Sequence, residues 1–107
     1  MDAERAGVFG LGEPLMEVYV ACFDISDDGL RTRAGKVLLC HGDRVQKSVF
    51  EISVRDRAEL EGIRRELVEI VGDDDNIRFY RLCAACRGAS STLDGSDVAG
   101  FPAVLIV

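Results

Sequence analysis

The feature that most constrains this fold is a pair of amphipathic helical patterns with strand patterns before, between and after them. The first helical pattern repeats apolar residues along a single stripe: Leu30, Ala34, Val37 and Leu38. The second pattern spans about residues 56–71, opens on Asp56 and Glu59 as a capping box would, and stops at Gly72. Each predicted helix therefore has one apolar face to bury.

The strand patterns differ in kind. Residues 15–25 are apolar and rich in β-formers, as in a central strand. In the stretch 44–54, Val45 and Val49 are apolar on odd positions, and then Phe50, Ile52 and Val54 take the even ones. Because a strand pleats with period two, the switch requires a bulge or tight break near residues 49 and 50. We predict two short strands there, or one sharply kinked strand.

Two further strands, at 77–86 and 101–107, complete the order βαββαβ with one extra carboxyl-terminal strand. This order predicts a ferredoxin-like α+β sandwich, with two helices on one face of an antiparallel sheet. Residues 1–15 are expected to be a flexible leader and residues 16–107 a single domain. The strand at 101–107 needs a sheet edge, its own or a second subunit's. The uncovered sheet face predicts a homodimer.

Charge and hydropathy exclude several classes of protein. The net charge of −6 argues against a protein that coats nucleic acid by bulk attraction. Residues 31–47 nevertheless hold five basic side chains and one acidic one, which is compatible with a localised phosphate contact. No apolar run is long enough to span a bilayer, and the amino end does not resemble a signal peptide. We expect a cytoplasmic protein that does not enter membranes.

The stretch "FDISDD" ends the first strand on a carboxylate, Asp24. Asp27 and Asp28 are interpreted as helix caps rather than metal ligands. Arg31 and Arg33 lie near the start of the predicted helix, where cations oppose the macrodipole. Helix stability does not explain these arginines, and the pattern therefore favours a ligand slightly.

The four cysteines are Cys22, Cys40, Cys83 and Cys86. Cys22 and Cys40 lie in apolar stretches and are expected to be small buried thiols. Only "CAAC" has ligand-like spacing, and no second CxxC or HxxxH completes a zinc set. A structural role is favoured for Cys83 and Cys86, while a zinc or redox element stays open as a weaker alternative.

Three stretches, "FDISDD" after its apolar strand, "LRTR" and "GDRVQKSVFEI", together resemble the Cas2 family of small CRISPR-associated endonucleases. "IRFYRLCAAC" also resembles that family's fourth strand. The resemblance runs from about residue 16 to residue 86. It implies a ferredoxin-like fold, a two-fold homodimer, and a carboxyl-terminal strand that joins the partner's sheet.

The resemblance also implies an activity and its residues. The family has been described as Mg²⁺-dependent nucleases acting on RNA or double-stranded DNA, and as partners of the CRISPR integrase in spacer acquisition. Asp24 would be the catalytic metal ligand, Arg31, Arg33 and Arg44 would contact nucleic acid, and Phe50 would pack near the site or at the dimer seam, although a role as a core aromatic is favoured. A non-catalytic dimer that holds DNA in the integrase complex is the alternative.

The chain departs from the family pattern at two positions within the matching stretches. Phe23 and Lys47 stand where the family commonly has tyrosine. Neither departure touches the expected metal ligand.

Overall fold

The computed structural model describes residues 16–72 and 76–99. In this part the chain forms a four-stranded sheet and three helices. The strands are β1 (Glu17–Phe23), β2 (Gly42–Gln46), β3 (Val49–Val54) and β4 (Ile77–Leu82), and the helices are α1 (Asp28–Leu39), α2 (Arg57–Val71) and α3 (Ala84–Gly88). The sheet order is β2-β3-β1-β4, with every neighbouring pair antiparallel.

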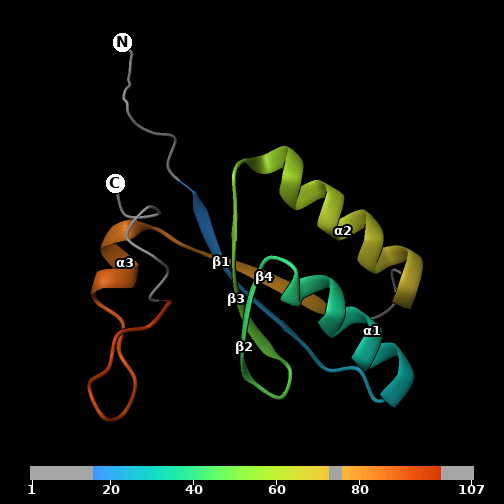
Figure 1. The fold of residues 1–107 in the computed structure, drawn as a ribbon, viewed down its shortest axis with the longest axis horizontal. Coiled ribbons are helices and arrows are strands. Elements are labelled where there is room, and N and C mark those ends of the chain that lie inside the picture. The colour runs from blue at the N-terminus through green and yellow to red at the C-terminus, as the bar shows by residue number, and fades with distance from the viewer. Residues whose placement is uncertain (1–15, 73–75, 100–107) are drawn as a thin grey trace.

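Helices α1 and α2 lie together on one side of the sheet, and α3 lies apart from them, next to the carboxyl end of β4 (Figure 1). This arrangement confirms the ferredoxin-like α+β prediction for the described residues. The predicted leader at 1–15 and the predicted strand at 101–107 lie outside them. No helix in the described ranges has the length and apolar character needed to cross a membrane.

The phase change in the central stretch is a hairpin. Strands β2 and β3 are separate and antiparallel, joined by a turn at Lys47 and Ser48. The pairing also shifts register between Arg44 and Gln46. The two-strand alternative is therefore correct, and the break comes just before the predicted position because a polar pair forms the turn.

The core fills the space between the sheet and the two long helices. Strand β3 alternates cleanly, with Phe50, Ile52 and Val54 fully buried and the residues between them half-buried. The predicted helix faces point into the same core, with Ala34 and Leu38 from α1 and three residues of α2 that share its apolar face: Leu60, Ile63 and Leu67. The helical periodicity of the sequence therefore identified the buried faces.

The prediction for the fourth strand was wrong at its carboxyl end. Strand β4 stops at Leu82, which pairs with Val18 at the beginning of β1. Beyond that pair β1 offers only Glu17, so further residues of β4 would have little to pair with. Cys83 instead becomes the N-cap of α3, a helix that begins with two alanines, the best helix formers.

Both long helices begin at the predicted aspartates. The Asp27 carboxylate accepts a hydrogen bond from the Leu30 amide at 2.9 Å, and the Asp56 carboxylate accepts one from the Glu59 amide at 2.9 Å. Glu59 in turn accepts from the Arg55 backbone amide at 2.7 Å. Its second oxygen lies 3.4 Å from His41 Nδ1. Glu59 thus links the start of α2 to the residues after α1.

Glu59→Gln is expected to lower the free energy of unfolding at pH 7 by about 1 kcal/mol. The Arg55 backbone amide is the main cause that lowers the pKa of Glu59 below its ordinary 4.5. A lowered pKa in the folded state stabilises the fold above about pH 4.5, and this contribution is lost as pH falls through the folded pKa. Urea unfolding of both proteins between pH 7 and pH 3 measures the difference, which should shrink in acid.

Glu66→Gln provides the matched control, because Glu66 is exposed on the same helix. The urea midpoint of this variant should stay close to that of the wild type over the whole pH range. A Glu59→Gln protein as stable as Glu66→Gln at pH 7 would contradict the role assigned to Glu59.

Candidate metal and nucleic-acid site at the end of β1

Asp24 directly follows β1, the strand that lies between β3 and β4. The residues on either side, Phe23 and Ile25, are 8% and 4% exposed and belong to the core. Because its two neighbours are anchored inward, the exposed Asp24 is held at a fixed place on the surface. Among the described residues, no hydrogen bond or ion pair engages its carboxylate.

The end of β1 is tied to the β2–β3 turn. The Phe23 amide donates to the Ser48 carbonyl at 3.1 Å. This contact places the turn at Lys47 and Ser48 beside the strand end that carries Asp24. Sequence reasoning missed it, because only the three-dimensional pairing of β1 with β3 brings the two segments together.

Arg31 has a local structural role. Its guanidinium donates to the Ile25 carbonyl at 2.9 Å and forms an ion pair with Asp28. These contacts fasten the start of α1 to the segment that carries Asp24. Arg31 therefore has structural partners, which the position of a cation near a helix start did not reveal from the sequence. The same contacts fix the guanidinium close to the strand end, where a phosphate contact was predicted.

Arg33 and Arg44 differ in their surroundings. Arg33 is exposed on α1, next to the buried Ala34. The Arg44 guanidinium lies 5.6 Å from the centre of the Phe50 ring, in a cation–π arrangement. A Cβ added at Gly35 would lie 3.5 Å from an Arg44 nitrogen and 3.3 Å from Phe50 Cζ. The glycine therefore lets Arg44 and Phe50 approach α1 closely.

Gly35 was not singled out from the sequence, although a glycine beside the apolar stripe of a helix is a usable signal of close packing. Phe50 itself is fully buried in the core of its own chain. Its ring stacks on Phe23, with the two ring centres 5.7 Å apart. Phe50 thus packs on Phe23, the residue directly before Asp24, inside its own chain.

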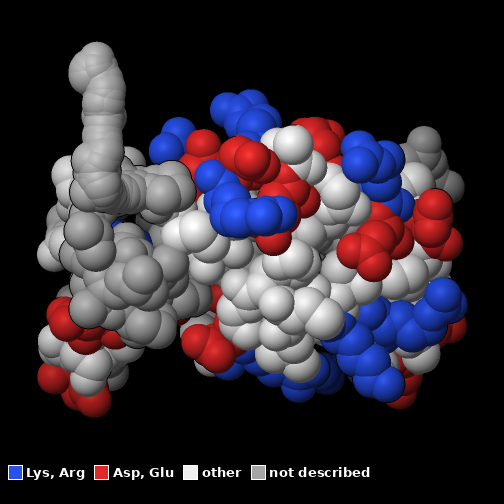
Figure 2. Space-filling model, turned by 45° about the horizontal axis from the view of Figure 1, so that its top comes forward, with Lys and Arg blue, Asp and Glu red and all other residues white. Residues whose placement is uncertain are grey.

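Charged side chains of both signs are mixed on the face drawn in Figure 2. It shows Lys and Arg side chains in separate groups, several with acidic side chains beside them. That face therefore presents local cationic groups rather than a broad basic surface. Such groups suit contacts to individual phosphates, which position a nucleic acid without reading its sequence.

How well Mg²⁺ would fit here depends on the oxygen ligands that the chain offers. Mg²⁺ prefers oxygen ligands and is commonly held by one or two carboxylates together with water and phosphate. Asp24 supplies one exposed carboxylate per chain. Within residues 16–72 and 76–99, no three His, Cys, Asp or Glu side chains gather into a metal-binding group. One exposed carboxylate fits Mg²⁺ only as a single ligand, with other oxygen atoms needed to fill the remaining positions.

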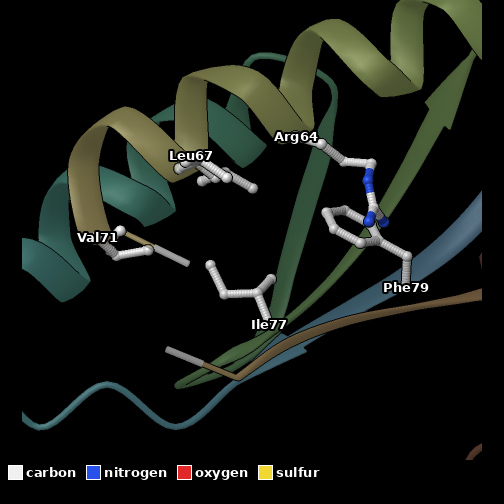
Figure 3. Close-up of a pocket in the computed structure, with 7 residues that line it drawn as sticks. Arg64, Leu67, Val71, Ile77 and Phe79 are labelled. Atoms are coloured by element: carbon white, nitrogen blue, oxygen red, sulfur yellow. The ribbon is translucent and has the colours of Figure 1, made fainter. Parts of the chain in front are cut away.

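A separate hollow of about 220 Å³ lies between α2 and β4. Figure 3 shows Leu67, Val71 and Ile77 around it, with the Arg64 side chain extended toward the Phe79 ring. The Arg64 guanidinium lies 5.6 Å from the centre of that ring. Among the described residues, the side chains that line it include no carboxylate, hydroxyl or imidazole. The described lining therefore offers no group for the hydrolytic chemistry.

A sequence-family profile described as "CRISPR associated protein Cas2" matches residues 16–89, which include every element of the sheet, the start of α1 and Asp24. The chain belongs to the Cas2 family.

Curated Cas2 relatives support the assignment. The chain is 38% identical over 87 residues to "CRISPR-associated endoribonuclease Cas2 4" of Rhodospirillum rubrum, covering 81% of this chain and 70% of the relative. It is 39% identical over 71 residues to "CRISPR-associated endoribonuclease Cas2 1" of Chloroflexus aurantiacus, covering 64% of this chain and 75% of that protein.

Solved Cas2 structures share the fold. One chain of a "Partial Cas6-RT-Cas1--Cas2 complex" superposes with a TM-score of 0.73 at 30% identity, covering 80% of this chain and 100% of that one. The crystal structure of Streptococcus pyogenes Cas2 gives a TM-score of 0.63 at 30% identity, covering 71% of this chain and 98% of that one. These structures confirm the predicted family and its α+β fold.

Proposed function

We propose that this protein is a CRISPR-associated, metal-dependent endonuclease that hydrolyses phosphodiester bonds of RNA or double-stranded DNA, in spacer acquisition and antiviral defence. The observation that carries the proposal is Asp24, an exposed carboxylate fixed at the end of a central strand with no partner among the described residues. The names of the curated relatives, which call them endoribonucleases, support the same class of reaction.

Each residue of the predicted site has a part in the proposed chemistry. Bound Mg²⁺ would supply an acidified water and polarise a phosphoryl oxygen. Asp24 would hold the ion. Arg31, already fixed by the Ile25 carbonyl, would hold a backbone phosphate in place, and Arg33 and Arg44 would contact neighbouring phosphates. The arginines act on charge and therefore do not select a base sequence.

The site is proposed to be completed in a homodimer. The sheet face opposite α1 and α2 carries Val20 beside Tyr80, and Cys22 beside Val49. Tyr80 is 50% exposed, and the other three are half-buried in the isolated chain. A second copy on this face would bury these side chains and bring a second Asp24 to the assembly. Two carboxylates repel each other unless a cation lies between them, which favours metal binding.

The activity is tested with the purified full chain, labelled RNA and labelled duplex DNA. Light scattering first establishes the molar mass, which should be that of a dimer. Cleavage of at least one substrate is expected with Mg²⁺ and should disappear in excess chelator. Absence of cleavage of both substrates by a confirmed dimer, or equal cleavage in chelator, would overturn the nuclease proposal.

A second function is favoured by the match to a chain of a Cas6-RT-Cas1–Cas2 complex. In this alternative the protein is a non-catalytic dimer that binds the CRISPR integrase and holds DNA between integrase subunits. Spacer acquisition in cells that carry Asp24→Asn separates the two functions. A pure scaffold should support wild-type acquisition, whereas loss of acquisition with a stably folded dimer would show that Asp24 is needed.

Arg33→Gln is expected to weaken RNA binding without changing the free energy of unfolding, because Arg33 is exposed on α1. Each lost phosphate contact reduces the slope of log affinity against log salt by about 0.7 for a single strand. Fluorescence anisotropy over a salt series measures that slope. Arg65→Gln, which removes the same charge from the exposed side of α2, is the control and should leave the slope unchanged. Equal slopes for both variants would exclude a phosphate contact by Arg33.

A further inference from the structure

Cys83 and Cys86 form a pair that the proposed nuclease site does not use. Cys83 follows Leu82, which pairs with the beginning of β1, whereas Asp24 follows the end of β1. The two features therefore lie at opposite ends of the sheet. Both cysteines are exposed.

The backbone holds the two thiols together. Cys83 is the N-cap of α3, and its Sγ accepts a hydrogen bond from the Cys86 amide at 3.4 Å. The Cys83 sulfur therefore lies over the first turn of α3, beside the backbone of Cys86. The Cys86 sulfur is joined to that same backbone nitrogen through only Cα and Cβ, so the two thiols occupy one turn of chain. The other two cysteines lie on separate elements, Cys22 on β1 and Cys40 after α1. The expectation that both are buried thiols was wrong, because Cys22 is half-buried and Cys40 is exposed.

The two thiols are not equivalent. Hydrogen bonds from Cys86 are the main cause that lowers the pKa of the Cys83 thiol, and the positive charge of Arg81 contributes. The hydrogen bond to Cys83 raises the pKa of the Cys86 thiol. A thiol whose thiolate is favoured attacks disulfides first, and its neighbour resolves the product. A zinc role receives no support, because no further ligand joins the pair within the described ranges.

We propose that Cys83 and Cys86 form a redox-active dithiol that exchanges with external disulfides and closes reversibly into an intrachain disulfide. This revises the structural role that the sequence favoured for the pair. The reduced form would predominate in a reducing compartment, where disulfides in proteins are commonly transient.

The exchange balances in two steps. The Cys83 thiolate attacks one sulfur of an external disulfide, a Cys83–sulfur bond forms, the external sulfur–sulfur bond breaks, and one thiolate leaves. The Cys86 thiol then gives its proton to solvent and attacks the Cys83 sulfur, which releases the second external thiolate. Two electrons pass to the external disulfide, which becomes two thiols after taking up the two protons that the cysteines lost.

The test uses the reduced full chain and glutathione disulfide as the external disulfide. Trypsin cleavage after Arg81 and Arg87 gives the peptide LCAACR, which contains both cysteines. Samples are quenched in acid, alkylated and analysed by mass spectrometry. The peptide should lose two hydrogens under oxidising ratios of glutathione and regain them in excess reduced glutathione. Cys22 and Cys40 should stay largely reduced under the same conditions and should therefore be found alkylated.

Three variants make the test specific. Cys86→Ser should stop at a mixed disulfide with one glutathione on Cys83, formed several-fold faster than on Cys40. Cys83→Ser should give no intrachain disulfide, and Cys40→Ser should behave as the wild type. All replaced side chains are exposed, so the variants should fold, and circular dichroism checks that they do. Oxidation only between chains, glutathione on Cys83 no faster than on Cys40, or zinc held by the purified protein would overturn the proposal.

Discussion

Replacing Asp24 with asparagine is expected to lower the rate of nucleic-acid cleavage by at least about 100-fold, or about 2.7 kcal/mol of transition-state stabilisation. Asparagine removes the charge that would hold Mg²⁺ but keeps nearly the same size. Because Asp24 is exposed and has no partner among the described residues, the free energy of unfolding should not change. Affinity for RNA measured in chelator should not fall either, since the arginines supply that contact.

The control for this prediction is Asp43→Asn. Asp43 is an exposed aspartate on β2. It pairs with Glu51 in the middle of β3, whereas the beginning of β3 lies beside Asp24. This variant changes the net charge equally and should cleave at the wild-type rate. Comparable losses in both variants would indicate a general electrostatic effect instead of a metal ligand. Single-turnover cleavage of labelled substrate measures both rates.

Gly42→Ala is expected to destabilise the fold by at least about 3 kcal/mol. A Cβ at this position would lie 1.9 Å from the Glu51 carbonyl oxygen and 2.7 Å from Ile52 Cα. Both contacts are with backbone atoms of β3, which cannot move aside as a flexible side chain could. Gly42 pairs with Ile52 at the beginning of β2, so the clash would force the β2–β3 hairpin apart. Nucleic-acid binding should fall with stability, because β2 carries Arg44.

Gly62→Ala is the matched control. Its added Cβ would meet only the Arg65 guanidinium, at 3.8 Å, on the surface of α2. Alanine within a helix is favoured over glycine by about 1 kcal/mol, so this variant should be slightly more stable than the wild type. Urea unfolding followed by circular dichroism compares the two. Equal midpoints for Gly42→Ala and the wild type would show that the hairpin can separate without cost at this position.

The fold was predictable because its main signals are local. The helical stripe around Ala34 and Leu38, the cap at Asp56 and the phase change before Phe50 each depend on residues close together in sequence. The end of β4 was predicted wrongly because it depends on where β1 begins, and β1 is more than 50 residues away in the sequence. A strand pattern cannot show where its pairing partner stops.

The candidate site was only partly predictable for the same reason. The place of Asp24 follows from an apolar strand that ends on a carboxylate. The bond from Arg31 to the Ile25 carbonyl and the contact of Phe23 with Ser48 depend on how α1 and the hairpin turn back on β1. Helix electrostatics alone therefore could not identify the two structural partners of Arg31, the Ile25 carbonyl and Asp28.

In the proposed enzyme, the nuclease site is complete only when two chains each contribute Asp24. The most direct test is cleavage by mixed dimers, purified through two different affinity tags, in which one chain is wild type and the other carries Asp24→Asn. A shared metal site predicts that the mixed dimer cleaves almost as slowly as the double variant at limiting Mg²⁺. Cleavage at half the wild-type rate would show that each chain acts alone, and would contradict the shared site.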